Sequence, residues 1–283
     1  MNLSTNIMCF QQVFGIEKTL GIFAQAGFDA IEFNTDIEEY YTDARDKNYY
    51  KELKILSDSL GIKIPQAHAP FRFGTDMKDA EKAKKHFHEI IKGIEHSSYL
   101  GTEMIIVHPI RHTDLEIEEN REQLFEYNFR YYNALVPYAE EYGVKIAIEN
   151  INPSIWQTAE NVARLYDELN NPNFVVCFDV GHGNIIGEDP AEMIRTLSDR
   201  IKCTHVHDNN STADSHTLPF YGTIDWESVM KAFAEVGYIG NLNYEAGLFV
   251  KNVPETLRPD AAKYMAKVGR HLIGRYNYYM SNK

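Results

Sequence analysis

Two residues of types that commonly bind metal ions lie together at the end of an apolar run. Residues 174–178 are almost wholly apolar, and Asp179 and His182 follow, flanked by Gly181 and Gly183. This predicts a buried strand that opens onto a site, because the glycines let the backbone turn tightly once the strand ends. A carboxylate beside a neutral imidazole suits Zn²⁺ or Mn²⁺. For the pair alone, a loop cap beside a structural histidine is the preferred interpretation.

The same residue types recur after most of the other predicted strands. Those on or just beyond strands three, four, five, seven and eight are His68, His108, Glu149, His205, His207 and Glu245. If the strands are parallel and form a barrel, their carboxyl ends meet at one mouth, where the active sites of such barrels form. Each position alone could be a cap or a hydrogen-bonded core group. Their repetition at strand after strand favours a metal site.

Strand-like and helix-like runs alternate along the chain, which is typical of βαβ units and a parallel sheet. The predicted strands are Leu3–Phe10, Ala30–Phe33, Lys63–Ala67, Met104–Val107, Lys145–Ile148, Phe174–Phe178, Ile201–Val206 and Leu242–Tyr244. The predicted helices are Ile16–Ala26, Tyr49–Leu60, Asp76–Leu100, Glu118–Tyr142, Thr158–Leu169, Pro190–Leu197, Trp226–Val236 and Pro254–Tyr278. Several helices end at a glycine that precedes a strand, as at Gly27, Gly61 and Gly143.

Eight strands and eight helices predict the α/β class and a single (β/α)₈ TIM barrel. The chain has 283 residues, near the roughly 250 at which one such barrel closes, and no Pro/Ser-rich linker interrupts it. We therefore expect one domain over residues 1–283. An open nucleotide-binding sheet would need a G-x-G-x-x-G motif after its first strand, and residues 9–15 carry none.

Charge and composition limit the classes of partner. The chain carries 28 basic and 41 acidic residues, a formal charge of −13, which disfavours nucleic acid and anionic lipid as partners. A small neutral or weakly anionic molecule fits better. Cys9, Cys177 and Cys203 all fall in predicted strands, so we expect reduced core thiols and a cytoplasmic location. No signal peptide and no apolar run of about 18 residues is present, so neither export nor a membrane span is expected.

An ordered set of motifs between about His68 and Glu245 resembles the xylose isomerase-like TIM barrel superfamily. That superfamily includes sugar-phosphate isomerases and epimerases and endonuclease IV. The motifs are His68-Ala69-Pro70-Phe71, Val107-His108-Pro109, Glu149-Asn150, Asp179-Val180-Gly181-His182, His205-Val206-His207-Asp208-Asn209, Asp214-Ser215-His216 and Gly222-Thr223-Ile224-Asp225-Trp226.

The resemblance implies a metal ion held by Glu149, Asp179, His205 and Glu245. His205 is preferred to His207 because the superfamily's ligand stands three residues before an Asp, here Asp208. Strand alternation sends His207 to the same face, where it would touch substrate or replace His205. The resemblance also offers the additional ligands with which endonuclease IV holds a zinc cluster, so the cofactor is one or more divalent ions. These additional ligands are His68, His108, His182, Asp214 and His216.

Two glutamates beside one cation suit an aldose–ketose isomerisation or an epimerisation next to a carbonyl. The cation stabilises an enediolate while one glutamate removes a proton and the other returns it, and Glu149 and Glu245 are the expected pair. The expected substrate is a small carbohydrate, with histidines near its hydroxyls and aromatic residues as an apolar wall. These substrate-binding candidates are His68, His182, His207, Phe71, Trp156 and Phe249.

Some features depart from the superfamily, and other functions stay open. Residues 209–213 lack the arginine that ketose 3-epimerases carry there, and Phe220 and Tyr221 make the next loop bulkier. Arg72 and Arg111 are the clearest candidates for a phosphate clamp. The alternatives are a multinuclear zinc phosphodiesterase like endonuclease IV and a non-catalytic sugar-binding barrel. The sequence leaves the metal's identity, the sugar and assembly into homo-oligomers undecided.

Overall fold

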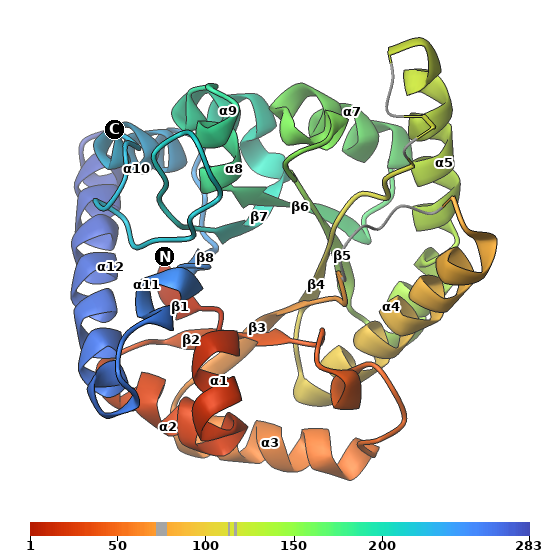
Figure 1. The fold of residues 1–283 in the computed structure, drawn as a ribbon. Helices are drawn as coiled ribbons and strands as arrows, with labels where there is room; N and C mark the ends of the chain where they lie inside the picture. The colour runs from red at the N-terminus through yellow and green to blue at the C-terminus, as the bar shows by residue number, and fades with distance from the viewer. Residues whose placement is uncertain (72–77, 113, 116–117) are drawn as a thin grey trace.

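Parallel strands wound around a central axis form the inner layer of the molecule. The computed structural model describes residues 1–71, 78–112, 114–115 and 118–283 (Figure 1). The strands are β1 (Asn2–Thr5), β2 (Ala30–Asn34), β3 (Lys63–His68), β4 (Met104–Val107), β5 (Lys145–Glu149), β6 (Phe174–Asp179), β7 (Ile201–His205) and β8 (Asn241–Tyr244). All pair in parallel, so their carboxyl ends face the same way.

The strand order follows the chain. Strands β2 to β7 form a curled six-stranded sheet, and β1 pairs with β8 in a second, two-stranded sheet. Single parallel bridges, Asn6 to Glu32 and Val206 to Tyr244, link the pair to both edges of the larger sheet. Figure 1 shows the strands around the centre and the helices outside them.

The outer layer consists of helices that connect successive strands. The α-helices are α1 (Met8–Phe14), α2 (Ile16–Ala26), α3 (Lys47–Ser59), α4 (Ala80–Leu100), α5 (Arg121–Asn133), α6 (Val136–Tyr142), α7 (Ala159–Leu169), α8 (Val180–Ile185), α9 (Pro190–Leu197), α10 (Trp226–Glu235), α11 (Gly247–Lys251) and α12 (Arg258–Ser281). The short 3₁₀ helices are η1 (Glu38–Tyr40), η2 (Glu118–Asn120), η3 (Ile155–Gln157), η4 (Ser198–Arg200) and η5 (Glu255–Leu257).

The expected succession of helix, glycine and strand is present at several joints. Gly27, Gly101 and Gly143 follow α2, α4 and α6 with φ of 95°, 72° and 65°, a left-handed conformation that glycine adopts without a steric penalty. Aspartate side chains cap the N-termini of helices that start after loops, as Asp46 does for α3 and Asp79 for α4. These local signals place each helix end beside the next strand.

Several predicted boundaries are wrong. The predicted strand Leu3–Phe10 covers β1 and the start of α1, so Cys9 lies in a helix and is only partly buried. The predicted helix Glu118–Tyr142 is divided into η2, α5 and α6, and Pro137, which lacks a backbone N–H, stands in the first turn of α6.

Other differences concern helix ends and short helices. The predicted helix Asp76–Leu100 begins at Ala80 as α4, and its residues 76 and 77 lie outside the described residues. The final helix starts at Arg258 rather than at Pro254. Two short helices were not predicted: α8, which follows β6 directly, and α11, which Glu245 and Ala246 separate from β8. In both cases too few residues are involved for an apolar periodicity to show in the sequence.

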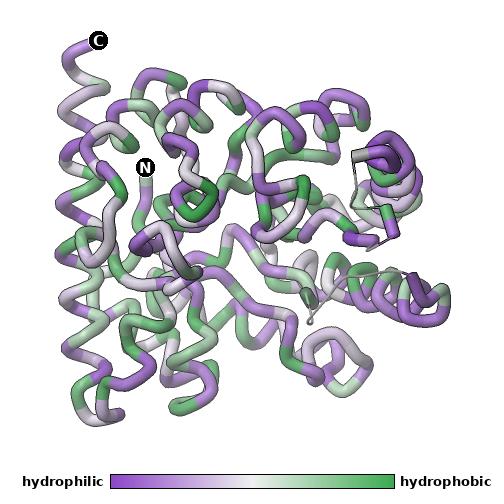
Figure 2. Tube along the Cα trace, turned by 45° about the horizontal axis from the view of Figure 1, so that its top comes forward, coloured by the Kyte–Doolittle hydropathy of each residue, from purple (hydrophilic) through white to green (hydrophobic). Residues whose placement is uncertain are grey.

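Apolar side chains divide into two clusters. The larger lies between strands and helices and draws on residues from Leu3 to Tyr276. The smaller, Ile106, Ala147, Val175, Cys177 and Cys203 with Met104 against it, comes from β4 to β7. Figure 2 shows green and purple turns alternating along the long C-terminal helix α12, as expected for a helix with one buried face. No helix in the described part of the chain is both long and apolar enough to cross a bilayer.

Candidate metal centre

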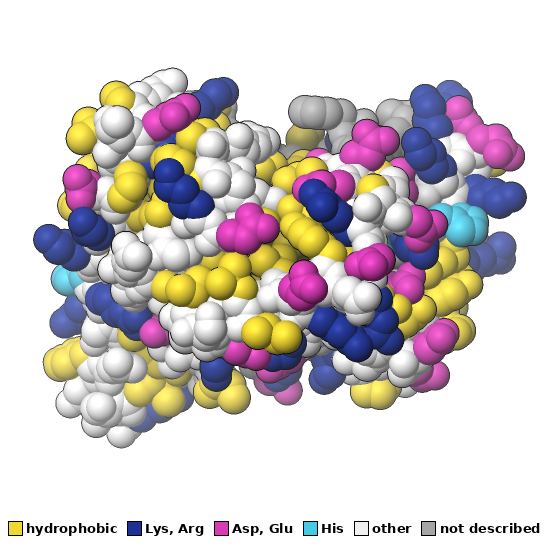
Figure 3. Space-filling model, turned by 90° about the horizontal axis from the view of Figure 1, so that it is seen from below, with side chains coloured by type: hydrophobic (Ala, Val, Ile, Leu, Met, Phe, Trp, Pro, Cys, Tyr) yellow, Lys and Arg dark blue, Asp and Glu magenta, His cyan; other side chains and the backbone are white. Residues whose placement is uncertain are grey.

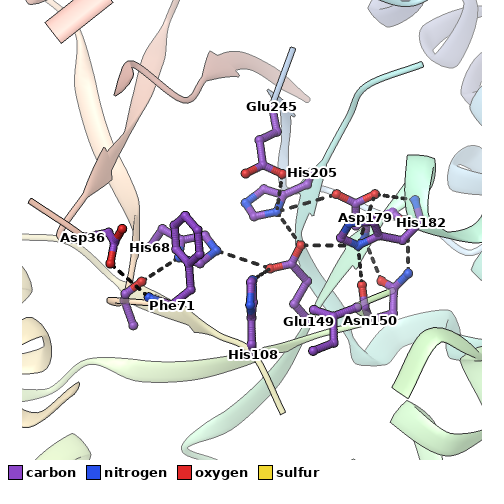
Figure 4. A network of polar contacts seen from close by, with 12 residues as sticks. Asp36, His68, Phe71, His108, Glu149, Asn150, Asp179, His182, His205 and Glu245 are labelled. Carbon is purple, nitrogen blue, oxygen red and sulfur yellow. Dashed lines mark hydrogen bonds and ion pairs between the residues drawn. The ribbon is translucent and has the colours of Figure 1, made fainter. Parts of the chain in front are cut away.

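Histidines and carboxylates from the carboxyl ends of the strands converge at one end of the barrel (Figure 4). His68, Glu149, Asp179 and His205 are the last residues of β3, β5, β6 and β7, and Glu245 directly follows β8. His68, Glu149, Asp179 and His205 are almost completely buried. The strand register explains the convergence, because Glu149 lies beside Cys177 and Asp179 lies beside His205 in neighbouring parallel strands.

The four residues expected to hold the principal metal ion lie together. Glu149, Asp179, His205 and Glu245 each offer a ligand atom, and these atoms all lie within 4.8 Å of one another. His205 Nδ1 is 2.8 Å from Glu149 Oε1, 3.3 Å from Glu245 Oε2 and 3.9 Å from Asp179 Oδ2. Three carboxylates around one imidazole nitrogen repel one another unless positive charge lies between them.

Glu149 connects this quartet to a second group of ligands. Its Oε2 atom is 3.2 Å from His108 Nε2 and 3.4 Å from His68 Nε2, while its Oε1 faces His205. His68, His108 and Glu149 form a group with ligand atoms within 4.8 Å of one another. The two oxygens of Glu149 therefore face two different groups, the arrangement of a bridging carboxylate.

A third group lies on the other side of Asp179. Its members are His182, His207, Asp214 and His216, again with ligand atoms within 4.8 Å. Asp214 Oδ2 is 2.9 Å from His216 Nε2 and 3.4 Å from His182 Nε2. His207 Nε2 lies 3.1 Å from Asp179 Oδ1 and 3.7 Å from Asp214 Oδ1.

Backbone carbonyls hold three of these imidazoles in one tautomer. Nδ1 of His68, His182 and His216 lies 2.7–2.8 Å from the carbonyl oxygens of Ala69, Asn150 and Glu245, respectively. Since a carbonyl oxygen only accepts, Nδ1 is the nitrogen that carries the proton and donates it. When the ring is neutral, the lone pair is on Nε2, which points toward the carboxylates. Metal-binding histidines are held in this way.

The site's electrostatics call for positive charge. Burial alone would lower the pKa of His182, but Asp179, Asp214 and Glu149 raise it to about 10. Burial likewise opposes the charged form of His216, yet Glu245 and Asp214 raise its pKa to about 9. Burial raises the pKa of Glu149, but His205 and His108 bring it well below its usual value. In the metal-free protein, protons on imidazoles balance the carboxylates, a role that a divalent cation takes over when it binds.

Two carboxylate oxygens in this centre are buried and accept no hydrogen bond from the residues that the structure describes. They are Glu149 Oε2 and Asp179 Oδ2. The other oxygen of Asp179 accepts from the His182 amide at 2.7 Å and so caps α8. Buried polar atoms in folded proteins are nearly always paired, so an oxygen without a partner that faces other ligand atoms fits a bound cation. The residues present therefore fit a divalent ion with oxygen and nitrogen ligands.

A cavity of about 610 Å³ opens above these ligands. Its polar side includes His68, His108, Glu149, His182, Asp214, His216 and Glu245. Its apolar side includes Met8, Cys9, Phe71, Ile151 and Leu248. A pocket with an apolar wall and a few convergent polar groups is the usual form of a small-molecule site.

Not every predicted substrate-binding residue lies there. His68, Phe71 and His182 line the cavity, as does Arg111, whereas Arg72 is outside the described residues. Trp156 is absent from the described lining. It is completely buried and packs edge-on against Phe125 at 4.8 Å between ring centroids, a contact that fills the space between η3 and α5.

Four further residues that were expected at the cavity are not among its described lining residues. His207 is completely buried and packs against Gly181, where an added Cβ would lie 2.0 Å from the imidazole ring. Phe220 and Tyr221 are 54% and 56% exposed and are not among the described lining residues, so the bulk of this loop does not narrow the cavity. Phe249 packs against Tyr221, and its neighbour Leu248 is the residue that lines the apolar side of the cavity.

The sequence analysis missed residues from the first two strands and from α1. Asn6 and the α1 residues Met8 and Cys9 line the cavity. Glu32 on β2 is completely buried and contacts His205 Nε2 at 2.8 Å. A single carboxylate between Ile31 and Phe33 in an apolar strand was a usable signal, because a buried charge needs a partner.

Strands surrounded by helices, with candidate metal ligands at the strand carboxyl ends, place the chain in the class of α/β barrels with a site at the mouth. The family model described as the xylose isomerase-like TIM barrel matches residues 20–267, and the chain belongs to this family. An uncharacterised protein of Methanocaldococcus jannaschii is 30% identical over 229 residues, covering 78% of this chain and 76% of that protein. The inosose dehydratase of Clostridium perfringens is 26% identical over 261 residues, covering 81% and 82%.

Solved structures show the same fold. The structure titled "D-tagatose 3-epimerase-like protein" superposes with a TM-score of 0.76 and 24% identity, covering 96% of this chain and 100% of the other. The structure of IOLI protein with a bound zinc atom superposes with a TM-score of 0.80 and 20% identity, covering 99% of each chain. At these identities the superpositions show that the chain shares the fold of these structures.

Proposed function

We propose that this protein is a divalent-metal-dependent isomerase or epimerase of a small carbohydrate. The observation that carries the proposal is the meeting of Glu149 and Glu245 at one side of the His205 ring, with Asp179 beside them. We propose further that residues 1–283 form one domain and a closed (β/α)₈ barrel. The bridges at both edges of the sheet and the larger apolar cluster, which spans the chain, support this architecture.

Glu149, Asp179, His205 and Glu245 would hold the principal ion, Zn²⁺ or Mn²⁺. The zinc atom in the IOLI protein structure supports a divalent ion in this fold. When bound, such an ion polarises the substrate's carbonyl and hydroxyl oxygens and stabilises an enediolate. His68, His108 and Glu149 would hold a second ion, and His182, Asp214 and His216 a third. Because Glu149 belongs to two of these ligand groups, the arrangement supports at least two ions.

The protein's own groups would move the proton. One glutamate of the pair Glu149 and Glu245 takes the proton from the carbon next to the carbonyl, and the other returns it to the neighbouring carbon or to the opposite face. His182 and His68 line the polar side of the cavity, within reach of sugar hydroxyls. Phe71 and Leu248 provide the apolar side against which the C–H face of the sugar packs.

The test is a panel of ketoses, aldoses and inososes incubated in deuterated water and analysed for deuterium incorporation, combined with elemental analysis of the purified protein. We expect bound metal and one substrate that exchanges a carbon-bound proton. Glu149→Gln should lower the rate by about 10³-fold, since a positioned acid–base group contributes 10²–10⁴. Glu141→Gln, an exposed residue of α6, is the matched control. A protein without metal and without exchange on any sugar would refute the proposal.

A zinc-dependent phosphodiesterase like endonuclease IV is the second candidate. The three adjoining ligand groups favour it, because they could hold a cluster of ions. The charge of −13 opposes it, and the face shown in Figure 3 carries basic and acidic side chains interspersed rather than a basic stripe. Tight, salt-sensitive binding of DNA containing an abasic site would reverse the ranking.

A further inference from the structure

Glu32 is a charged residue inside the barrel that the proposed chemistry does not use. It lies at the middle of β2, is completely buried, and receives hydrogen bonds from different elements of the barrel. Asn6 Nδ2 donates to Oε1 at 2.7 Å, and Gln66 Nε2 and Asn243 Nδ2 donate to Oε2 at 2.7 and 3.0 Å. Its Oε2 also lies 2.8 Å from His205 Nε2.

The contact with His205 decides which ring nitrogen carries the proton. A carboxylate that already receives three amide hydrogen bonds is an acceptor, so His205 Nε2 must donate to it. In the neutral ring the lone pair is then on Nδ1, the nitrogen that faces Glu149, Asp179 and Glu245. The opposite tautomer would direct an N–H into the ligand group and could not bind a cation.

His205 is held differently from three other histidines of the centre. His68, His182 and His216 donate to backbone carbonyls, whereas His205 donates to a buried carboxylate. A charged acceptor makes the imidazole a stronger donor to a metal ion than a carbonyl does, and loss of such a partner lowers metal affinity 10–100-fold in proteins.

We propose that Glu32 is a positioning residue that fixes His205 with its proton on Nε2 and thereby sets the affinity of Glu149, Asp179, His205 and Glu245 for a divalent cation. The inference rests on the proposed function, since it assumes that this quartet holds the principal ion. Asn6, Gln66 and Asn243 serve it by holding the carboxylate in place. Glu32 itself is not among the described residues that line the cavity, and it belongs to none of the three ligand groups found there.

The experiment is a zinc titration of the full chain, freed of metal by dialysis against a chelator, in competition with a chelating dye of known affinity. Glu32→Gln keeps the shape of the side chain and removes the charge, and we expect zinc binding at the tightest site to weaken 10–100-fold. Glu141→Gln is the matched control, because it makes the same substitution at an exposed carboxylate of α6 that belongs to none of the ligand groups. It should stay within about threefold of the unmodified protein.

A second readout needs no variant. In ¹⁵N-histidine NMR spectra of the unmodified zinc-loaded protein, His205 should show a protonated Nε2 and a zinc-bound Nδ1. A proton on Nδ1, zinc affinity unchanged in Glu32→Gln, or equal weakening in Glu141→Gln would each overturn the inference. Failure of the unmodified protein to bind zinc or manganese would instead refute the proposed function, so the two failures are distinguishable.

Discussion

The inside of the barrel has two halves of opposite character. The inward positions of β8, β1, β2 and β3, below the ligands, are Asn243, Ser4, Glu32 and Gln66. Those of β4 to β7 are Ile106, Ala147, Val175, Cys177 and Cys203, a small apolar cluster. Barrel interiors are ordinarily filled by apolar side chains, as the second half is. Packing alone does not account for the polar half, and its contact with His205 links it to the proposed metal centre.

The two halves also differ in how they accommodate a buried carboxylate. Glu32 is buried in the polar half together with four groups that face its two oxygens. The described contacts of the apolar half offer no comparable set of donors, since its members are aliphatic residues and cysteines. The same carboxylate should consequently have very different effects in the two halves.

The largest effect should come from placing a carboxylate in the apolar half. Ala147 is completely buried beside Ile106 and Val175, so Ala147→Asp would add a charge with no partner and too little space. We expect a loss of at least about 4 kcal/mol in the free energy of unfolding, measured by urea denaturation, or no folded protein at all. Ala147→Val is the control for volume. A folded Ala147→Asp protein of ordinary stability would contradict the distinction between the halves.

Removal of the carboxylate from the polar half should have the next largest effect. Glu32→Met has a similar volume but leaves the amide groups of Asn6, Gln66 and Asn243 without their acceptor. We expect the metal-free protein to lose about 3 kcal/mol in urea denaturation, because the cost is that of stranded donors and of an unpaired imidazole. Stability equal to that of the unmodified protein would show that the polar half packs equally well without its charge.

The two halves also differ in how far the sequence predicts them. The apolar half can be predicted from continuous apolar runs such as residues 174–178. Such a run indicates a buried strand without information from the rest of the chain. In the polar half, the strand Ala30–Phe33 was predicted nearly correctly, but its Glu32 was not singled out. The partners of Glu32 come from positions 6, 66, 205 and 243, and the sequence around β2 does not indicate them.

The candidate site shows the same division. Repetition of ligand types at strand ends was enough to predict that they converge at one mouth, because parallel strands bring their carboxyl ends together. The family resemblance singled out Glu149, Asp179, His205 and Glu245, which do lie together. How deeply each side chain is buried could not be predicted in this way. Trp156 was expected in the cavity wall since it follows β5 closely, yet the packing of η3 on α5 turns its ring into the core.

A smaller effect, in the metal-free protein, should depend on pH. Burial raises the pKa of Glu32, but His205 and His68 bring it below 4.5, so its contribution to stability is present above pH 4.5 and is lost as the pH falls. Burial opposes charge on His205, yet Glu149, Glu245 and Glu32 raise its pKa well above 6.5. Its contribution is complete below pH 6.5 and is lost as the pH rises.

The difference in melting temperature between the unmodified protein and Glu32→Met should therefore be greatest between about pH 4.5 and 6.5 and should shrink on both sides. Differential scanning fluorimetry of chelator-treated protein measures it. Zinc should reduce the alkaline loss in the unmodified protein, because a metal-bound imidazole needs no proton. A difference that stays constant from below pH 4.5 to well above pH 6.5 would mean that the charge of Glu32 plays no part.

The smallest effect should come from a change of size in the apolar half. Cys203 is buried against Cys177, its neighbour in the register of β6 and β7, and burial raises the pKa of the Cys177 thiol well above its usual value. Both thiols therefore behave as small apolar groups, and Cys203→Ala should cost about 1 kcal/mol in urea denaturation. Zinc affinity should be unchanged, since the substitution touches neither Glu32 nor a ligand. If Cys203→Ala instead weakened zinc binding as much as Glu32→Gln, the two halves would be equally coupled to the metal centre, and the polar half would have no special role.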